Sequence, residues 1–245
     1  MSDSASLESR VSSFIIQSSW DEPEDEELWE FTRTTGLPVM SCEEDFILSI
    51  TPEPSVMVFA DTSIIQHLIG RQLVPDTYPS CFKSLYRRDI TTGLFGDARN
   101  RLLPYFIKLA GQNKDFRARV VQTAEAAATI AEDVGDQIVH VCDAVEFVCE
   151  HRLFMGPAKI WGTAEYSEHV LDEDMIVPSQ VPEAFLQEVL ACNALGYVVV
   201  DVGLTRAGTW CVVEVNPPFA LSSYGLDIKI YVRYCCAAWA HILGE

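Results

Sequence analysis

Three polar side chains near the end of the chain have the residue types that bind a divalent cation. Asp201 ends one apolar run, Glu214 lies thirteen positions later in the next, and Asn216 follows Glu214 by two positions. Alternate residues of a strand face the same side, so Glu214 and Asn216 share a face, and a hairpin would bring Asp201 beside them. Such oxygen ligands suit Mg²⁺ that is bound together with phosphate groups. A solvated strand end with an Asn-Pro turn is the alternative, but the apolar neighbours of Glu214 favour the metal site.

Two lysines form a second candidate group. Lys108 lies within the apolar run 105–109, where burial of its ammonium group is costly unless an anion meets it. Lys114 follows six positions later, after a glycine-containing turn. The pair would bind phosphate groups from two adjoining strands. The alternative is a lysine that extends to solvent from an edge strand, and the carboxylates downstream favour the phosphate site.

The third candidate group is a strand with acidic and basic side chains at alternate positions. Glu146, Glu150 and Arg152 share this spacing and are expected to line one face. The residues just before it, Asp143 to Val145, are short and apolar enough to place backbone groups against the edge of a base. An ordinary amphipathic strand with a cross-paired glutamate and arginine explains the pattern equally well.

The elements that would hold these groups fall into two parts. Residues 1–75 are expected to form a small α/β lobe, with strands at 13–17 and 55–60 and helices at 21–33 and 61–69. Residues 76–245 contain a helix to residue 86, a strand pair at 103–109 and 116–121, a helix at 123–134, strands at 137–142, 145–155 and 158–166, a helix at 182–195, a hairpin at 197–202 and 209–215, and a helix at 226–243. This order predicts an α+β protein with two facing sheets.

The amino-acid composition and charge of the chain limit the kinds of function that it can have. The chain has 245 residues, 49% of them hydrophobic, and a formal net charge of −19, which disfavours nonspecific binding to nucleic acid or to an anionic membrane. It has no apolar run of membrane-spanning length, and its first residues lead us to expect no secretory signal. The eight cysteines are scattered without a CxxC pair. We therefore expect reduced thiols and a cytoplasmic protein.

The order of these motifs resembles the ATP-grasp superfamily, and most closely its clade named for a shared arginine and two lysines. The resemblance extends over roughly residues 75–240. It implies that ATP lies between two antiparallel sheets. One sheet belongs to a central lobe at about 90–142 and the other to a C-terminal lobe at about 143–245, and the small N-terminal lobe precedes both. The motifs that carry it are Tyr105-Phe-Ile-Lys108, Lys114-Asp-Phe116, Glu150-His-Arg152-Leu-Phe154, Asp201 and Val213-Glu214-Val-Asn216.

The resemblance also implies a role for each candidate residue. Arg152 would meet the transferring phosphate or an acyl phosphate, and Arg88, with Arg87 as the alternative, would be the arginine of the clade. Arg233 and Lys229 on the last helix would bind a substrate carboxylate, although an ordinary solvated surface position explains Lys229 better. The remaining roles are phosphate binding by Lys108 and Lys114, adenine contact by Asp143, Ala144 and Val145, ribose binding by Glu150, and Mg²⁺ binding by Asp201, Glu214 and Asn216.

The activity implied by the resemblance is that of a carboxylate–amine ligase. A carboxylate attacks the γ-phosphate of ATP, and an amine then displaces phosphate from the acyl phosphate. Small molecules or peptides would supply both substrates, and Lys108 and Arg152 would act on the transferring group. Two alternatives stay open, a phosphotransferase on the same fold and a non-catalytic nucleotide-binding or interaction module that uses the acidic segment 21–27.

Overall fold

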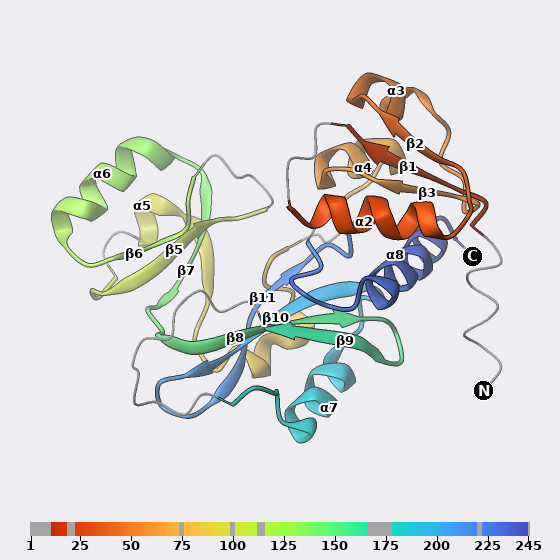
Figure 1. Ribbon diagram of the computed structural model, residues 1–245. Coiled ribbons are helices and arrows are strands. Elements are labelled where there is room, and N and C mark those ends of the chain that lie inside the picture. Colours follow the sequence, from red (N-terminus) through yellow and green to blue (C-terminus); the bar gives the residue numbers. More distant parts are fainter. Residues whose placement is uncertain are drawn as a thin grey trace.

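Three β-sheets, each formed by a different stretch of the chain, organise the molecule (Figure 1). The structure is a computed structural model. It describes residues 11–18, 23–73, 76–98, 101–111, 116–165, 178–219 and 222–244.

The N-terminal lobe contains a parallel sheet with its first strand in the centre, in the order β2-β1-β3. Parallel neighbours need crossover connections, and helices α2 and α3 provide them. The expected helix α4 is confirmed and ends at Gly70, whose φ of 67° is the left-handed conformation that glycine adopts readily. The elements are β1 (Ser13–Gln17), α2 (Pro23–Thr34), β2 (Val39–Cys42), α3 (Glu44–Ser49), β3 (Val56–Phe59) and α4 (Thr62–Ile69).

The central lobe is an antiparallel sheet in the order β4-β7-β5-β6. Alternation along its strands places Tyr105, Ile107 and Val141 in a core against helices α5 and α6, and turns Lys108 to the opposite face. The expected pairing of residues 105–109 with the next strand is confirmed. The elements are β4 (Thr91–Leu94), α5 (Phe95–Ala98), β5 (Tyr105–Leu109), β6 (Arg119–Val121), α6 (Ala124–Val134) and β7 (Ile138–Asp143).

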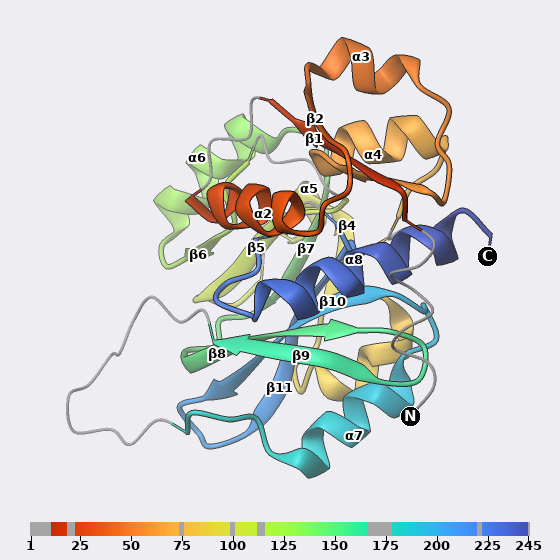
Figure 2. The same ribbon diagram turned by 45° about the vertical axis from the view of Figure 1, so that its right-hand side comes forward.

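The C-terminal lobe is a second antiparallel sheet, in the order β11-β10-β8-β9. One face, with Leu153 and Val200, packs on helices α7 and η1, while Phe154 on the other face packs on helix α8. Figure 2 shows α8 between this sheet and the N-terminal lobe. The elements are η1 (Ser80–Leu85), β8 (Phe147–Met155), β9 (Ile160–Glu165), α7 (Glu183–Cys192), β10 (Val198–Thr205), β11 (Trp210–Asn216) and α8 (Ile228–Ile242).

Several short elements differ from the sequence-based expectation. The helix expected before Tyr86 is a 3-10 helix, η1. Strands β2 and β4 and helix α3 were not expected, because each has four to six residues and few buried side chains. The boundary proposed near residue 75 remains a prediction, since α8 shares one hydrophobic core with the N-terminal sheet.

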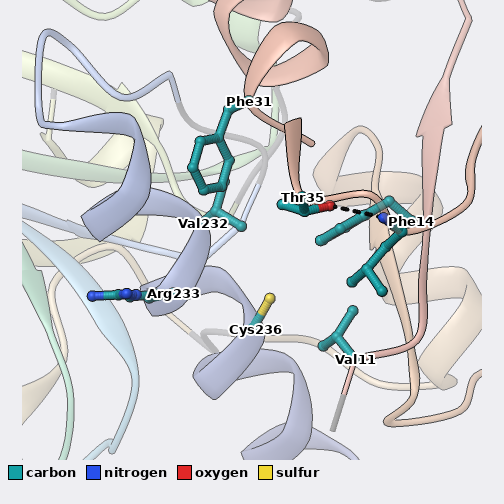
Figure 3. Close-up of a pocket in the computed structure, with 8 residues that line it drawn as sticks. Val11, Phe14, Phe31, Thr35, Val232, Arg233 and Cys236 are labelled. Atoms are coloured by element: carbon teal, nitrogen blue, oxygen red, sulfur yellow. Dashed lines mark hydrogen bonds between the residues drawn. The ribbon is translucent and has the colours of Figure 1, made fainter. Parts of the chain in front are cut away.

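A mostly apolar cavity lies where α8 meets the N-terminal lobe. In Figure 3 the side chain of Arg233 points away from the other residues that line it. Among the described helices, none is both long and apolar enough to cross a membrane. The lining residues are Val11, Phe14, Phe31, Thr35, Leu37, Val232, Arg233 and Cys236.

Candidate active site

Glu214, Asp201 and Arg152 form one row across three neighbouring strands. Asp201 on β10 lies directly opposite Glu214 on β11 and Arg152 on β8. Directly opposed side chains of adjacent strands are close neighbours on the same face of the sheet. The expected hairpin is therefore confirmed, and it brings together carboxylates from both of its strands.

Asn216 joins the two carboxylates of this row. Its Nδ2 donates to Asp201 Oδ2 at 2.9 Å and to Glu214 Oε1 at 3.3 Å, so the three predicted metal ligands form one hydrogen-bonded group. Among the described residues there is no cluster of three or more His, Cys, Asp or Glu side chains with metal-binding geometry. Two carboxylates and an amide oxygen suit Mg²⁺ when nucleotide phosphates and water supply its other ligands.

Arg152 and Asp201 form a buried two-bond ion pair. Arg152 Nε donates to Asp201 Oδ1 at 2.8 Å and Nη2 donates to Oδ2 at 2.9 Å, and the two residues are only 5% and 1% exposed. Burial raises the pKa of Asp201, and the guanidinium of Arg152 opposes this rise. The ring centroid of Tyr224 lies 4.3 Å from Arg152 Cζ and covers the guanidinium.

Lys108 connects the central sheet to this row. Its Nζ donates to Glu214 Oε2 at 2.5 Å, and both side chains are about one quarter exposed. The structure thus brings the predicted phosphate-binding lysine to a predicted metal ligand. The second lysine, Lys114, lies outside the described residues.

Arg88 lies beneath the strand that carries Glu214. Its Nη1 donates to Val212 O at 2.9 Å and its Nη2 to Val213 O at 2.7 Å. The register between β10 and β11 shifts at this point, so a β-bulge leaves these carbonyls available to the guanidinium. Arg87 instead forms an exposed ion pair with Glu188 at 3.3 Å, so of the two arginines Arg88 is the one that contacts the strand of Glu214.

The connection between the two antiparallel sheets is the predicted adenine-facing segment. Asp143 ends β7, and Ala144 and Val145 lead into β8. Asp143 is exposed and forms an ion pair with Arg101 at 3.0 Å, while Ala144 and Val145 are partly buried. This junction connects the two antiparallel sheets, and its contact with adenine stays a prediction.

Glu150 lies within β8, whereas Glu146 lies before this strand. Glu150 on β8 is partly buried, two residues before Arg152 on the same strand. The prediction that Glu146 lines the same face is wrong, because it precedes β8 and a register shift lies between Phe147 and Cys149. Glu146 instead forms an exposed two-bond ion pair with Arg206 at 2.8 Å.

Lys229 and Arg233 lie exposed on α8, one turn apart. The backbone N–H of Lys229 donates to the side chain of Asp227, which caps the helix at 2.8 Å. The structure places both residues on the helix that covers the C-terminal sheet, and their role as substrate ligands stays a prediction.

Sequence reasoning missed a polar group next to Lys108. His140, directly opposite Lys108, has its Nε2 2.9 Å from Asp76 Oδ1 and its Nδ1 2.9 Å from Thr92 Oγ1. The ring of Tyr78 packs on His140 with centroids 4.9 Å apart. Burial lowers the pKa of His140, and Asp76 opposes this change. Asp76 and Tyr78 belong to a segment that has the composition of a linker, so no local pattern signals this contact.

Comparisons with known proteins identify the family and the fold of the chain. The profile of an ATP-grasp domain, family 2 of the clade named for an arginine and two lysines, matches residues 85–234. The D-cycloserine synthetase DcsG aligns with a TM-score of 0.64 at 13% identity, over 94% of this chain and 99% of its own. A RimK domain ATP-grasp protein from Sphaerobacter thermophilus aligns at 0.55 and 14% identity, over 95% and 100%. The D-alanine-D-alanine ligase from Coxiella burnetii aligns at 0.55 and 12% identity, over 96% and 95%. No curated protein matches significantly. The predicted fold is confirmed.

Proposed function

Since the chain belongs to the ATP-grasp domains of this clade's family 2, we propose that it is an ATP-dependent ligase that joins a carboxylate to an amine. The observation that carries the proposal is the contact of Lys108 with Glu214, which lies in the row with Asp201 and Arg152. This arrangement combines a lysine for phosphate, carboxylates for a cation and an arginine for a transferring group. Those are the requirements of phosphoryl transfer.

ATP would lie between the two antiparallel sheets. Lys108 would exchange Glu214 for a phosphate oxygen, and Lys114 would bind the same phosphate chain. The backbone of residues 143–145 would face the adenine edge, and Glu150 would accept hydrogen bonds from the ribose hydroxyls. The partly exposed state of Lys108 and Glu214 supports this exchange, because both groups are accessible to a ligand.

Mg²⁺ would be held by Asp201, Glu214 and Asn216, which lie side by side because Asn216 Nδ2 donates to both carboxylates. When bound, Mg²⁺ would neutralise charge on the phosphates. Arg152 would orient the oxygens of the transferring phosphoryl group, and Arg88 would keep Glu214 in place through the bulge carbonyls. The attack of the substrate carboxylate on the γ-phosphorus releases ADP and leaves an acyl phosphate. An amine then attacks its carbonyl carbon and releases inorganic phosphate and a proton.

Small molecules or peptides are the proposed substrates. The aligned structures include a synthetase and a ligase for small molecules, and the macrocyclase MdnC bound with a precursor peptide. Arg233 and Lys229 are the proposed ligands of the substrate carboxylate. We also propose a cytoplasmic location, because ATP is available there and the scattered cysteines without a CxxC pair are typical of reduced thiols.

Release of ADP in the presence of carboxylate mixtures tests this proposal. Hydroxylamine serves as a general amine and traps an acyl phosphate as a hydroxamate. A ligase requires a carboxylate for ADP release and yields a hydroxamate that Lys108→Met abolishes. ADP release with an alcohol and without an amine would indicate a phosphotransferase instead. Folded protein that binds no nucleotide would contradict both activities and favour the interaction module.

A further inference from the structure

The turn between β11 and α8 places an aromatic ring over the buried pair of Arg152 and Asp201. Tyr224 is 38% exposed, whereas the two charged residues beneath it are nearly inaccessible. The ring centroid lies 4.3 Å from Arg152 Cζ, a distance at which a guanidinium is attracted to an aromatic face. Arg152 therefore has an aromatic partner in addition to the carboxylate.

Tyr224 holds this position in a backbone conformation that tyrosine disfavours. Its φ is +50°, and the following Gly225 has a φ of +79°. Glycine adopts the left-handed region readily, but a residue with a bulky side chain does so only where its surroundings hold it there. Residues in such conformations cluster at functional sites, so the strained backbone of Tyr224 indicates that this turn has a function.

The residues on both sides of Tyr224 are held by burial, and one of them packs on the C-terminal sheet. Ser223 and Leu226 are buried, and Leu226 N donates to Ser223 O at 3.0 Å. Leu226 fills the space above Gly162 of β9, where an added Cβ would lie 2.5 Å from Leu226 Cδ1. The position of the Tyr224 ring is therefore set by the packing of its neighbours.

Asp201 has two roles that compete under the proposed function. Both of its oxygens accept hydrogen bonds from Arg152, and the same carboxylate would bind Mg²⁺. A carboxylate that binds a cation attracts a guanidinium less strongly. The ring of Tyr224 is a partner of Arg152 that would not bind Mg²⁺.

We propose that Tyr224 is a positioning residue that keeps the Arg152 guanidinium at the phosphate-transfer site while Asp201 binds Mg²⁺. The proposal rests on the ligase function above. It predicts that the ring is dispensable in the free protein, where Asp201 holds Arg152, and is required once Mg·ADP is bound.

Arginine side-chain NMR on the full chain tests this role. The Nε–Hε signal of Arg152, assigned by its loss in Arg152→Lys, is followed without ligand and with Mg·ADP. Tyr224→Phe keeps the ring. Tyr224→Asn removes it without adding backbone strain, because asparagine tolerates the left-handed region, and Tyr224→Gly is a second ring-free variant. Calorimetry measures the affinity of each protein for Mg·ADP.

We expect wild type and Tyr224→Phe to keep a sharp, slowly exchanging Arg152 signal in both states. Tyr224→Asn and Tyr224→Gly should keep it without ligand but exchange at least tenfold faster with Mg·ADP, at an affinity within about threefold of wild type. Equal exchange rates of the Arg152 Nε–Hε proton in all four proteins bound to Mg·ADP would overturn the positioning role and leave the ligase function intact. Failure of folded wild type to bind Mg·ADP would overturn both.

Discussion

Lys108 Nζ lies 2.5 Å from Glu214 Oε2. This contact joins the two antiparallel sheets through residues that are 106 positions apart in sequence. The ammonium group of Lys108, which is predicted to bind phosphate, thus neutralises the carboxylate of Glu214, which is predicted to bind Mg²⁺. Nucleotide without Mg²⁺ would take Lys108 and leave Glu214 beside the phosphates. Mg²⁺ without nucleotide would compete with the lysine for Glu214. We therefore infer that nucleotide and Mg²⁺ bind cooperatively.

Arg88 is predicted to act on Mg²⁺ binding through Glu214. Replacement by methionine removes the donors to the Val212 and Val213 carbonyls at the bulge. We expect Mg·ADP affinity to fall about tenfold, because the bulge that orients Glu214 loses its support. Arg87→Met, one residue away and exposed, is the matched control and should bind Mg·ADP like wild type. Calorimetry compares the two variants, and equal affinities would contradict this role of Arg88.

Two arginine–carboxylate pairs of the same geometry should differ greatly in their effect on stability. Arg152→Met leaves Asp201 buried without its guanidinium, so the free energy of unfolding should fall by about 3–5 kcal/mol. Arg206→Met breaks the exposed pair with Glu146 and should leave the free energy of unfolding nearly unchanged. Urea unfolding measures both. Equal losses in the two variants would show that Arg152 and Asp201 do not form a buried pair in solution.

Stability is predicted to fall in mild acid because His140 is buried. Burial lowers its pKa below the usual value of 6.5, so the unfolded chain binds more protons than the folded protein between the lowered value and 6.5. The free energy of unfolding therefore decreases as the pH falls through this window. His140→Gln should reduce the slope, and the part that remains includes His151, whose pKa burial also lowers. Urea unfolding between about pH 7 and pH 5 measures the slopes, and an unchanged slope in His140→Gln would refute this explanation.

The cluster of Asp201, Glu214 and Asn216 could be predicted from sequence, because strand alternation and hairpin pairing are enough to bring these residues together. Strand alternation places Glu214 and Asn216 on one face, and a hairpin aligns Asp201 with Glu214. Lys108 was identifiable because a lysine within an apolar run needs an anionic partner. The same alternation rule failed for Glu146, because a register shift that no sequence pattern marks lies between it and Arg152.

The partners of these residues depend on tertiary structure. Lys108 meets Glu214 only after two sheets come together, and Asp76 reaches His140 from a segment without a periodic pattern. The short elements β2, β4 and α3 were missed for a related reason, since they have few buried side chains and so no clear hydrophobic pattern. The fold class needed only the order of the longer elements.

A calorimetric titration with ADP tests the central claim most directly. ADP is titrated, once in the presence of Mg²⁺ and once in the presence of EDTA, into wild type, Lys108→Met and Glu214→Gln. The control is Lys83→Met, which changes an exposed lysine of η1. We predict that Mg²⁺ tightens ADP binding at least tenfold in wild type and Lys83→Met. Lys108→Met should bind ADP at least tenfold more weakly, and Glu214→Gln should lose most of the Mg²⁺ effect. ADP binding that ignores Mg²⁺ and both site substitutions, or no binding by folded wild type, would contradict the account.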